Sequence, residues 1–361
     1  QLNTSIKNLA FVPKKRVVLE ENTGMGCQNC PLGHQAIEHL AQVYKDAFIP
    51  VAYHTYTGDK LESGMTDYAQ YFLGLNAAPT AMVHRNGKIS SPMVAYTEGG
   101  ATDYTFSSKE GDTWLDEVNK EIGVYAEADF NITASHNAET GAVEVPFTAN
   151  FAVEYPSANI GLLCIVTEDG LVGYQTNAFY TATDTDLGEW AAGGAYSKSH
   201  IYPFTFDHVA RALYPANAYN GQTGLLPNNI ECEKAYTGKV RFNLAQHAPY
   251  VEDINNCHIV CLMIDANTGR VINAASAKVQ NGTSAIESST DANGRIQVKG
   301  TKGGVLVKAK EDVCVTLYDT AGRMLHQANG KGSLWLPTSH QGVIVVKCET
   351  ADAVSTQKVV L

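Results

Sequence analysis

Residues 16–33 read RVVLEENTGMGCQNCPLG, and this stretch decides how the N-terminal part of the chain folds. Its first apolar residues predict a short buried strand, and the two glycines before the first cysteine predict a turn. Pro31 suits the first turn of a helix. We therefore expect Cys27 and Cys30 to lie between the end of a strand and the start of a helix.

That position gives the cysteine pair a chemical role. Unpaired backbone N–H groups and the helix dipole stabilise a thiolate at a helix N-terminus. We expect Cys27, at the exposed mouth of the turn, to be the attacking thiol, and Cys30, one turn on, to resolve a mixed disulfide.

Two alternatives for the pair stay open. A zinc site would need two more ligands, and His34 and His39 are five residues apart on the helix, so they point to different faces. A static structural disulfide would show the same C-x-x-C motif, because exported domains use disulfides freely.

Around this motif, the first 125 residues alternate between helical and strand patterns in the order β-α-β-α-β-β-α. The helix after Cys30 carries an apolar stripe of Leu32, Ala36, Ile37, Leu40, Val43, Tyr44 and Phe48. Further elements are expected as a strand at 48–56, a helix at 65–73, a strand at 81–83, a hairpin turn at 85–88 and a helix from 112.

The Ala78-Pro79 bond is predicted to be cis and to face the two cysteines. A proline at the start of a strand does not interrupt a hydrogen-bonded ladder. The small residues Ala77 and Ala78 would also let the backbone approach a sulfur atom closely. Of the two acids before the motif, Glu20 and Glu21, one is a candidate proton acceptor for Cys30.

The rest of the chain shows strand patterns. Residues 126–280 predict an antiparallel β-sandwich with a long loop or lid at 174–199. A polar linker at 280–293 leads to a small all-β domain, in which Cys314 and Cys348 are predicted to pair across strands. The expected fold class is therefore multidomain, α/β plus all-β, with domains at 1–125, 126–280 and 281–361.

Composition narrows the function classes. The chain has 361 residues and a formal net charge of −11, which argues against a nucleic-acid partner. No apolar run reaches the ~18 residues of a membrane span, and no motif calls for a cofactor. The chain opens at Gln1 with no initiator Met, so we expect a mature or trimmed N-terminus, which leaves a removed export signal open.

Residues 20–33 resemble the thioredoxin superfamily and, more closely, a family of Bacteroidetes outer-membrane lipoproteins and surface proteins, the outer membrane protein twenty-eight family. Residues 202–211, YPFTFDHVAR, resemble that family's aromatic–His–Val–x–Arg strand, and 259–279 resemble its closing strand. The resemblance covers about the first 280 residues. It implies a thioredoxin-like first domain and a location at the outer membrane, the cell surface or the periplasm.

The same resemblance implies site residues. They are Cys27, Cys30 and Pro79, with Glu21 aligned to the buried acid of thioredoxins. Thioredoxins usually carry Trp before the first cysteine and Gly-Pro between the pair. This chain has Gly26 and Gln28-Asn29 there, so a thioredoxin-like reduction potential does not follow.

Residues 315–323, VTLYDTAGR, resemble the C-terminal sorting domain of the type IX secretion system. This implies an Ig-like β-sandwich that contacts an export machinery.

Two functions of the whole chain remain open. One is an exported thiol–disulfide oxidoreductase acting on protein thiols. The other is a surface adhesion or binding protein that uses the thioredoxin fold as a scaffold and meets an unknown partner. The pKa and solvent access of Cys27 would discriminate between them.

Overall fold

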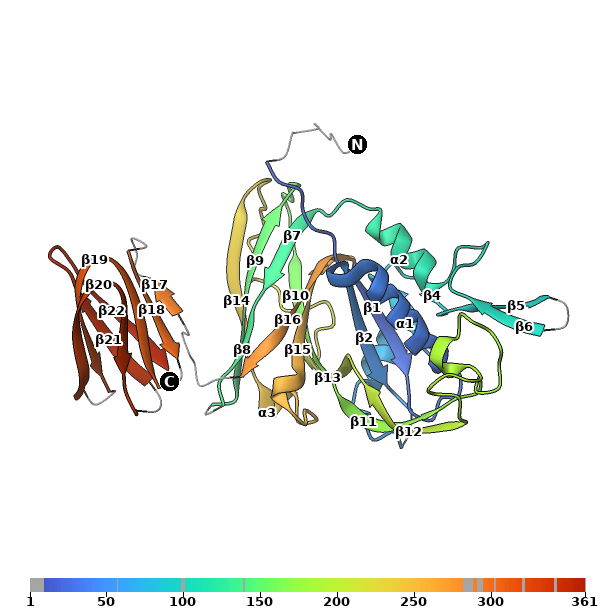
Figure 1. Ribbon diagram of the computed structural model, residues 1–361. Helices are drawn as coiled ribbons and strands as arrows, with labels where there is room; N and C mark the ends of the chain where they lie inside the picture. The colour runs from blue at the N-terminus through green and yellow to red at the C-terminus, as the bar shows by residue number, and fades with distance from the viewer. Residues whose placement is uncertain are drawn as a thin grey trace. The chain divides into compact units, whose positions relative to one another are not determined.

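The computed structural model describes residues 10–56, 58–98, 101–138, 140–281, 288–290, 295–301, 303–319, 322–340 and 343–360. Most of the described residues lie in β-strands and few lie in helices (Figure 1). The chain divides into two compact units, residues 1–134 with 141–280, and residues 135–140 with 281–361. The predicted boundary near 125 falls inside the first unit, and most of the predicted linker lies outside the described residues.

Along residues 10–281 the elements are β1 (Val17–Thr23), α1 (Pro31–Tyr44), η1 (Lys45–Ala47), β2 (Phe48–His54), η2 (Asp67–Phe72), β3 (Thr80–Val83), β4 (Ile89–Ser90), β5 (Val94–Glu98), β6 (Ala101–Thr105), α2 (Trp114–Ile122), β7 (Ala128–Ile132), β8 (Ala134–His136), β9 (Ala142–Phe151), β10 (Ile160–Glu168), β11 (Leu171–Thr176), η3 (Gly188–Trp190), β12 (His200–Phe206), β13 (Val209–Tyr214), β14 (Ala235–Asn243), α3 (Leu244–His247), η4 (Ile254–Asn256), β15 (Cys257–Asp265) and β16 (Val271–Asn281).

One sheet runs through the first unit in the order β16-β15-β10-β13-β2-β1-β3-β4. β1 pairs parallel with β2 and antiparallel with β3, and the predicted hairpin turn at 85–88 is confirmed between β3 and β4. β13 joins β2 in parallel, so strands from before and after residue 125 share this sheet. That sharing explains why residues 141–280 cluster with the N-terminal residues.

β1 separates two cores, because successive side chains of a strand point to opposite faces. Val17 and Leu19 pack against α1 and α2, with Trp114 of α2 at the centre of this cluster. Val18 packs on the other face. The alternation continues at the end of the strand, where Glu21 meets α1 and α2 and Glu20 lies on the opposite face.

A further core lies between the β7-β9-β14 strands and the strands β10, β15 and β16. Its residues include Phe130, Val145, Leu162 and Ile259. The prediction of a single closing strand at 259–279 is wrong, because these residues form two strands, β15 and β16, in a hairpin that turns at residues 265–270. Gly269 supplies a positive φ of 77° in that turn.

The second unit is built from β17 (Ser288–Thr290), β18 (Ile296–Thr301), β19 (Gly304–Tyr318), β20 (Met324–Pro337), β21 (Val343–Glu349) and β22 (Val354–Val360). Its sheet has the order β17-β18-β19-β21-β22, and β20 also pairs with β19. The predicted disulfide between Cys314 and Cys348 is wrong. Cys348 lies opposite Val315, so the alternation of side chains puts Cys314 on the other face of the sheet.

Candidate functional site

The turn after β1 delivers the two cysteines to the start of α1. The Cys27 amide donates to the Gly24 carbonyl over 3.1 Å, and Pro31 begins the helix directly after Cys30. The amides of Gly33 and His34 both donate to the Cys30 carbonyl, which closes the first helical turn. Cys27 and Cys30 are joined by a disulfide, with their Cα atoms 5.4 Å apart.

The disulfide is buried. Cys27 is 4% exposed and Cys30 is fully buried, so the expectation that Cys27 lies at an exposed mouth is wrong. The cover is β11, the loop that carries η3, and β12, which we call the covering segment, residues 171–206. Sequence analysis predicted a loop or lid at 174–199, but could not predict what it covers.

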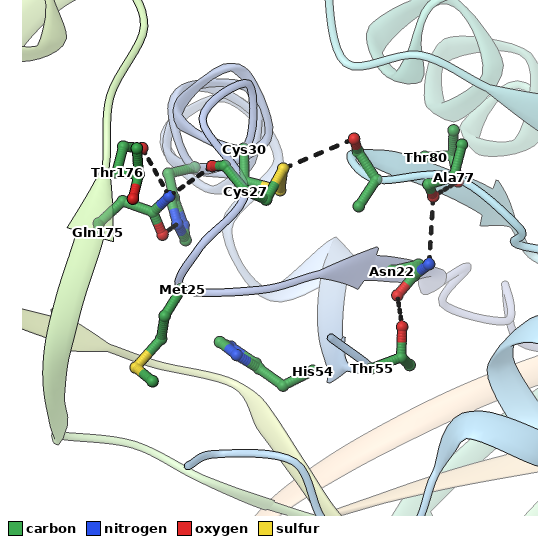
Figure 2. Close-up of a disulfide and its surroundings, with 12 residues drawn as sticks. Asn22, Met25, Cys27, Cys30, His54, Thr55, Ala77, Thr80, Gln175 and Thr176 are labelled. Atoms are coloured by element: carbon green, nitrogen blue, oxygen red, sulfur yellow. Dashed lines mark hydrogen bonds between the residues drawn. A yellow bond between two sulfur atoms is a disulfide. The ribbon is translucent and has the colours of Figure 1, made fainter. Parts of the chain in front are cut away.

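Backbone hydrogen bonds attach the covering segment to the cysteine loop. The Thr176 amide donates to the Met25 carbonyl over 3.0 Å, and the Ala178 amide donates to the Gln28 carbonyl over 2.9 Å. Between them, the Gln175 side-chain amide donates to the Cys27 carbonyl over 2.9 Å. Figure 2 shows Gln175 and Thr176 on one side of the disulfide, with Ala77 and Thr80 on the other.

His34 anchors the same cover from α1. Its Nε2 lies 3.2 Å from Gln175 Oε1, and its ring stacks on Trp190 and contacts Phe204. Because the Gln175 oxygen can only accept, Nε2 must carry the proton. Burial lowers the pKa of His34 to about 4, so the ring is neutral. The predicted divergence of His34 and His39 is confirmed, since His39 stacks on Phe106 instead.

The Ala78-Pro79 bond is cis and lies beside the disulfide, as predicted. The Ala78 carbonyl oxygen is 3.6 Å from Cys27 Sγ. The Pro79 side chain packs toward α1, where its Cβ lies 3.3 Å from the position of a Cβ added to Gly33. The backbone before β3 therefore flanks Cys27 on the side opposite the covering segment (Figure 2).

Glu21 lies beneath α1 with one carboxylate oxygen unsatisfied. It is 1% exposed, and its Oε2 has no hydrogen-bond partner among the described residues. That oxygen is 2.9 Å from the position of a Cβ on Gly33, one turn after Cys30. Burial raises the pKa of Glu21 to about 8.

The neighbouring acid, Glu20, is equally buried but has partners for both carboxylate oxygens. Glu20 accepts hydrogen bonds from Tyr53 and Tyr68 over 2.9 and 2.6 Å, and pairs with Arg85 over 3.1 Å. These partners satisfy its charge on the opposite face of β1. Of the two acids proposed as a proton acceptor, only Glu21 keeps an unpaired oxygen on the face of the disulfide helix.

Sequence analysis missed the groups that hold the turn before Cys27. The Asp59 carboxylate accepts hydrogen bonds from the Met25 amide and from His54 Nδ1, each over 2.8 Å. His54 Nε2 is buried and has no partner among the described residues, so this histidine is satisfied at one ring nitrogen only. No spacing in the sequence connects Asp59 or Gln175 to the cysteine motif, because both contacts are tertiary.

Two features of the described residues bear on membrane and metal chemistry. Every helix there is too short or too polar to cross a bilayer. Nor do three His, Cys, Asp or Glu side chains gather in those residues as a metal site would require.

The fold and comparisons with known proteins define a mostly β-sheet protein of the bacterial outer membrane or cell surface. The profile of the family described as outer membrane protein Omp28 matches residues 65–283, more than half of the chain. The chain belongs to this family. A search of the curated proteins finds no match.

Two solved structures are similar to the chain. HBP35 of Porphyromonas gingivalis is 18% identical, with a TM-score of 0.48, and the alignment covers 97% of this chain and 99% of that one. A protein of Agrobacterium tumefaciens is 16% identical, with a TM-score of 0.38, over 74% of this chain and 94% of that one.

Proposed function

We propose that this surface-associated protein exchanges thiols and disulfides with partner proteins through Cys27 and Cys30, at a site closed by the covering segment. The observation that carries the proposal is the buried carboxyl of Glu21 beneath the disulfide helix, whose Oε2 has no hydrogen-bond partner among the described residues. Such a group costs folding free energy, which a purely structural disulfide gives no reason to keep. Buried groups with displaced pKa values cluster at functional sites.

The exchange needs two steps. The Cys27 thiolate attacks a partner disulfide, a mixed disulfide forms, and one partner thiolate leaves and takes up a proton. Cys30 then gives its proton to the ionised form of the Glu21 carboxyl and attacks Cys27 Sγ. The second partner sulfur leaves as a thiolate and recovers a proton. The products are the Cys27–Cys30 disulfide and a partner with two thiols, and the reverse sequence oxidises a partner dithiol.

The pKa of Glu21, near 8, suits this role because the carboxyl can accept and return a proton near neutral pH. The Ala78 carbonyl, 3.6 Å from Cys27 Sγ, supplies a backbone group beside which an extended partner segment could pair. With Cys27 only 4% exposed, a partner sulfur reaches it only after the covering segment releases the cysteine loop.

A second function is favoured by that same burial. Both sulfurs are covered, so the pair could serve as a static cross-link in a surface binding or adhesion protein. In that case Glu21 would have no chemical role, and the covering segment would never open.

Trapping of the mixed disulfide separates the two functions. After reduction, Cys30→Ser should accumulate a covalent adduct with a protein disulfide substrate, because Cys27 attacks and nothing resolves the bond. Cys27→Ser should form none, and Cys257→Ser serves as a control that leaves the motif intact. If neither single variant is trapped, and the wild-type disulfide resists excess dithiol until the protein unfolds, the static cross-link is correct.

The finer fold assignments belong to this proposal. We propose a thioredoxin-like domain over residues 1–125, a β-sandwich over 126–280 and an Ig-like sorting domain over 281–361 that contacts an export machinery. The parallel β1-β2 pair with α1 between its strands supports the first. The all-β second unit supports the last.

A further inference from the structure

Two buried cysteines outside the proposed site lie directly opposite each other. Cys164 on β10 and Cys261 on β15 are register partners in an antiparallel pair of strands. Their Sγ atoms are 3.7 Å apart, and both side chains are fully buried in the core between the sheets. Directly opposed residues project to the same face with Cβ atoms about 4.5–5.5 Å apart, close to the ~3.5–4.5 Å of a disulfide. Small shifts would therefore bring the two sulfurs into bonding distance.

We propose that Cys164 and Cys261 form a second disulfide in the exported protein. The two thiols give up two protons and two electrons, and a disulfide oxidant of the compartment outside the cytoplasm takes them up and becomes two thiols. The outer-membrane or surface location of the family places the chain where such bonds persist. This cross-link is independent of the exchange proposed for Cys27 and Cys30.

The bond should form before the core closes. In the folded chain, the contact with Cys164 and burial raise the pKa of Cys261 well above its ordinary value. A thiol in that environment exchanges slowly, because the thiolate is the reactive form. Once formed, the bond would be sheltered from reductants for the same reason.

Cys257 provides a matched comparison within the same strand. It is also fully buried and belongs to the same core, four residues before Cys261. Its register partner on β10 is Glu168, so no sulfur lies opposite it. The proposal therefore assigns a disulfide to Cys261 and a thiol to Cys257.

Peptide mapping of the exported full-length chain tests the pairing directly. Thiols are alkylated in denaturant without reductant, and the chain is digested and analysed by mass spectrometry. We expect a linked peptide that contains Cys164 and Cys261 and is lighter than the two thiol peptides by two hydrogens. Cys257 should be alkylated. Recovery of alkylated Cys164 and Cys261 from the exported wild-type chain would overturn the proposal.

A stability measurement supplies a second readout. In a background with Cys27→Ser and Cys30→Ser, the chain that is reduced in denaturant and refolded under reductant should unfold several degrees below the untreated chain, because a bond between residues 97 positions apart restricts the unfolded chain. Cys164→Ala should abolish this reductant effect, and Cys257→Ala should retain it. An effect that is absent from the background, or unchanged in Cys164→Ala, would refute the cross-link.

Discussion

The Gln175 side chain donates a hydrogen bond to the Cys27 carbonyl over 2.9 Å, although the two residues are 148 positions apart in the chain. Its oxygen accepts from His34 in the first turn of α1. One side chain therefore holds both the disulfide loop and the helix that follows it. The exposure of the disulfide is set by this contact and by its backbone neighbours, not by the local C-x-x-C motif.

Gln175→Ala should speed the reduction of the Cys27–Cys30 disulfide by a dithiol about thirtyfold. The substitution removes the two hydrogen bonds by which this side chain joins the covering segment to Cys27 and His34, each contributing about 1 kcal/mol, and so raises the population in which the covering segment is open. The rate can be followed by quenching with an alkylating reagent and measuring the mass. Val172→Ala, an exposed position on β11, is the control and should react at the wild-type rate. Equal rates for both variants would mean that the covering segment does not limit access.

The local features of the site could be predicted from the sequence. The strand before the motif, the turn, the helix that starts at Pro31 and the cis bond before Pro79 all depend on neighbouring residues. The burial of Cys27 could not be predicted. It depends on which distant segment lies over the loop, and neither Gln175 nor Trp190 carries a pattern that points to a cysteine.

The buried face of α1 could also be predicted only in part from the sequence. Ala36 and Leu40 of the predicted apolar stripe are buried, but Val43 is 51% exposed. Close packing against the helix occurs at Gly33, where a Cβ would meet Glu21, Trp114 and Pro79 within 3.3 Å. The apolar pattern includes Val43, so it overestimates the width of the buried face. It gives no weight to a glycine, so it misses the packing of Glu21 and Trp114 at Gly33.

Glu21 predicts a pH dependence of stability. The folded-state pKa is raised to about 8 from an ordinary value near 4.5, so the folded chain holds a proton that the unfolded chain has lost between these values. The protonated carboxyl therefore favours folding below about pH 4.5, and that contribution is lost as the pH rises toward 8. Each pH unit in this window changes the contribution by about 1.4 kcal/mol.

Glu21→Gln should remove this dependence. Compared with wild type, the variant should become progressively more stable as the pH rises from 5 to 8, by up to several kcal/mol. Denaturant unfolding at a series of pH values measures the difference. Glu20→Gln is the contrasting variant and should destabilise the protein, because it removes the charge paired with Arg85. A pH-independent gap between wild type and Glu21→Gln would show that the carboxyl is not held neutral.

Gly33→Ala should destabilise the protein by about 1–3 kcal/mol, although alanine favours helices. A Cβ there would meet Glu21 Oε2 at 2.9 Å and Trp114 Cη2 at 3.1 Å. Gly26→Ala is a matched control beside the same disulfide, because its Cβ would meet only the Tyr174 hydroxyl at 3.7 Å. We expect that control within about 0.5 kcal/mol of wild type by denaturant unfolding. Similar losses in both variants would contradict the close packing of Glu21 under α1.

The first unit should fold without the C-terminal residues. The buried residues described for its three large cores all come from positions before 280. A chain ending at Gln280 should therefore unfold cooperatively with a stability within about 1 kcal/mol of the same transition in the full chain. If residues 281–361 act as the proposed sorting domain, this truncated chain should also lose its surface location.

Two measurements separate these expectations. Calorimetry of the purified truncated chain reports folding, and fractionation with surface labelling of cells reports location. A chain ending at Asn256 lacks β15 and β16, which carry Ile259 and Ile272 of the core, and should fail to fold. If the chain ending at Gln280 is equally insoluble, the two units are interdependent in folding. If it folds and still reaches the surface, residues 281–361 do not carry the export signal.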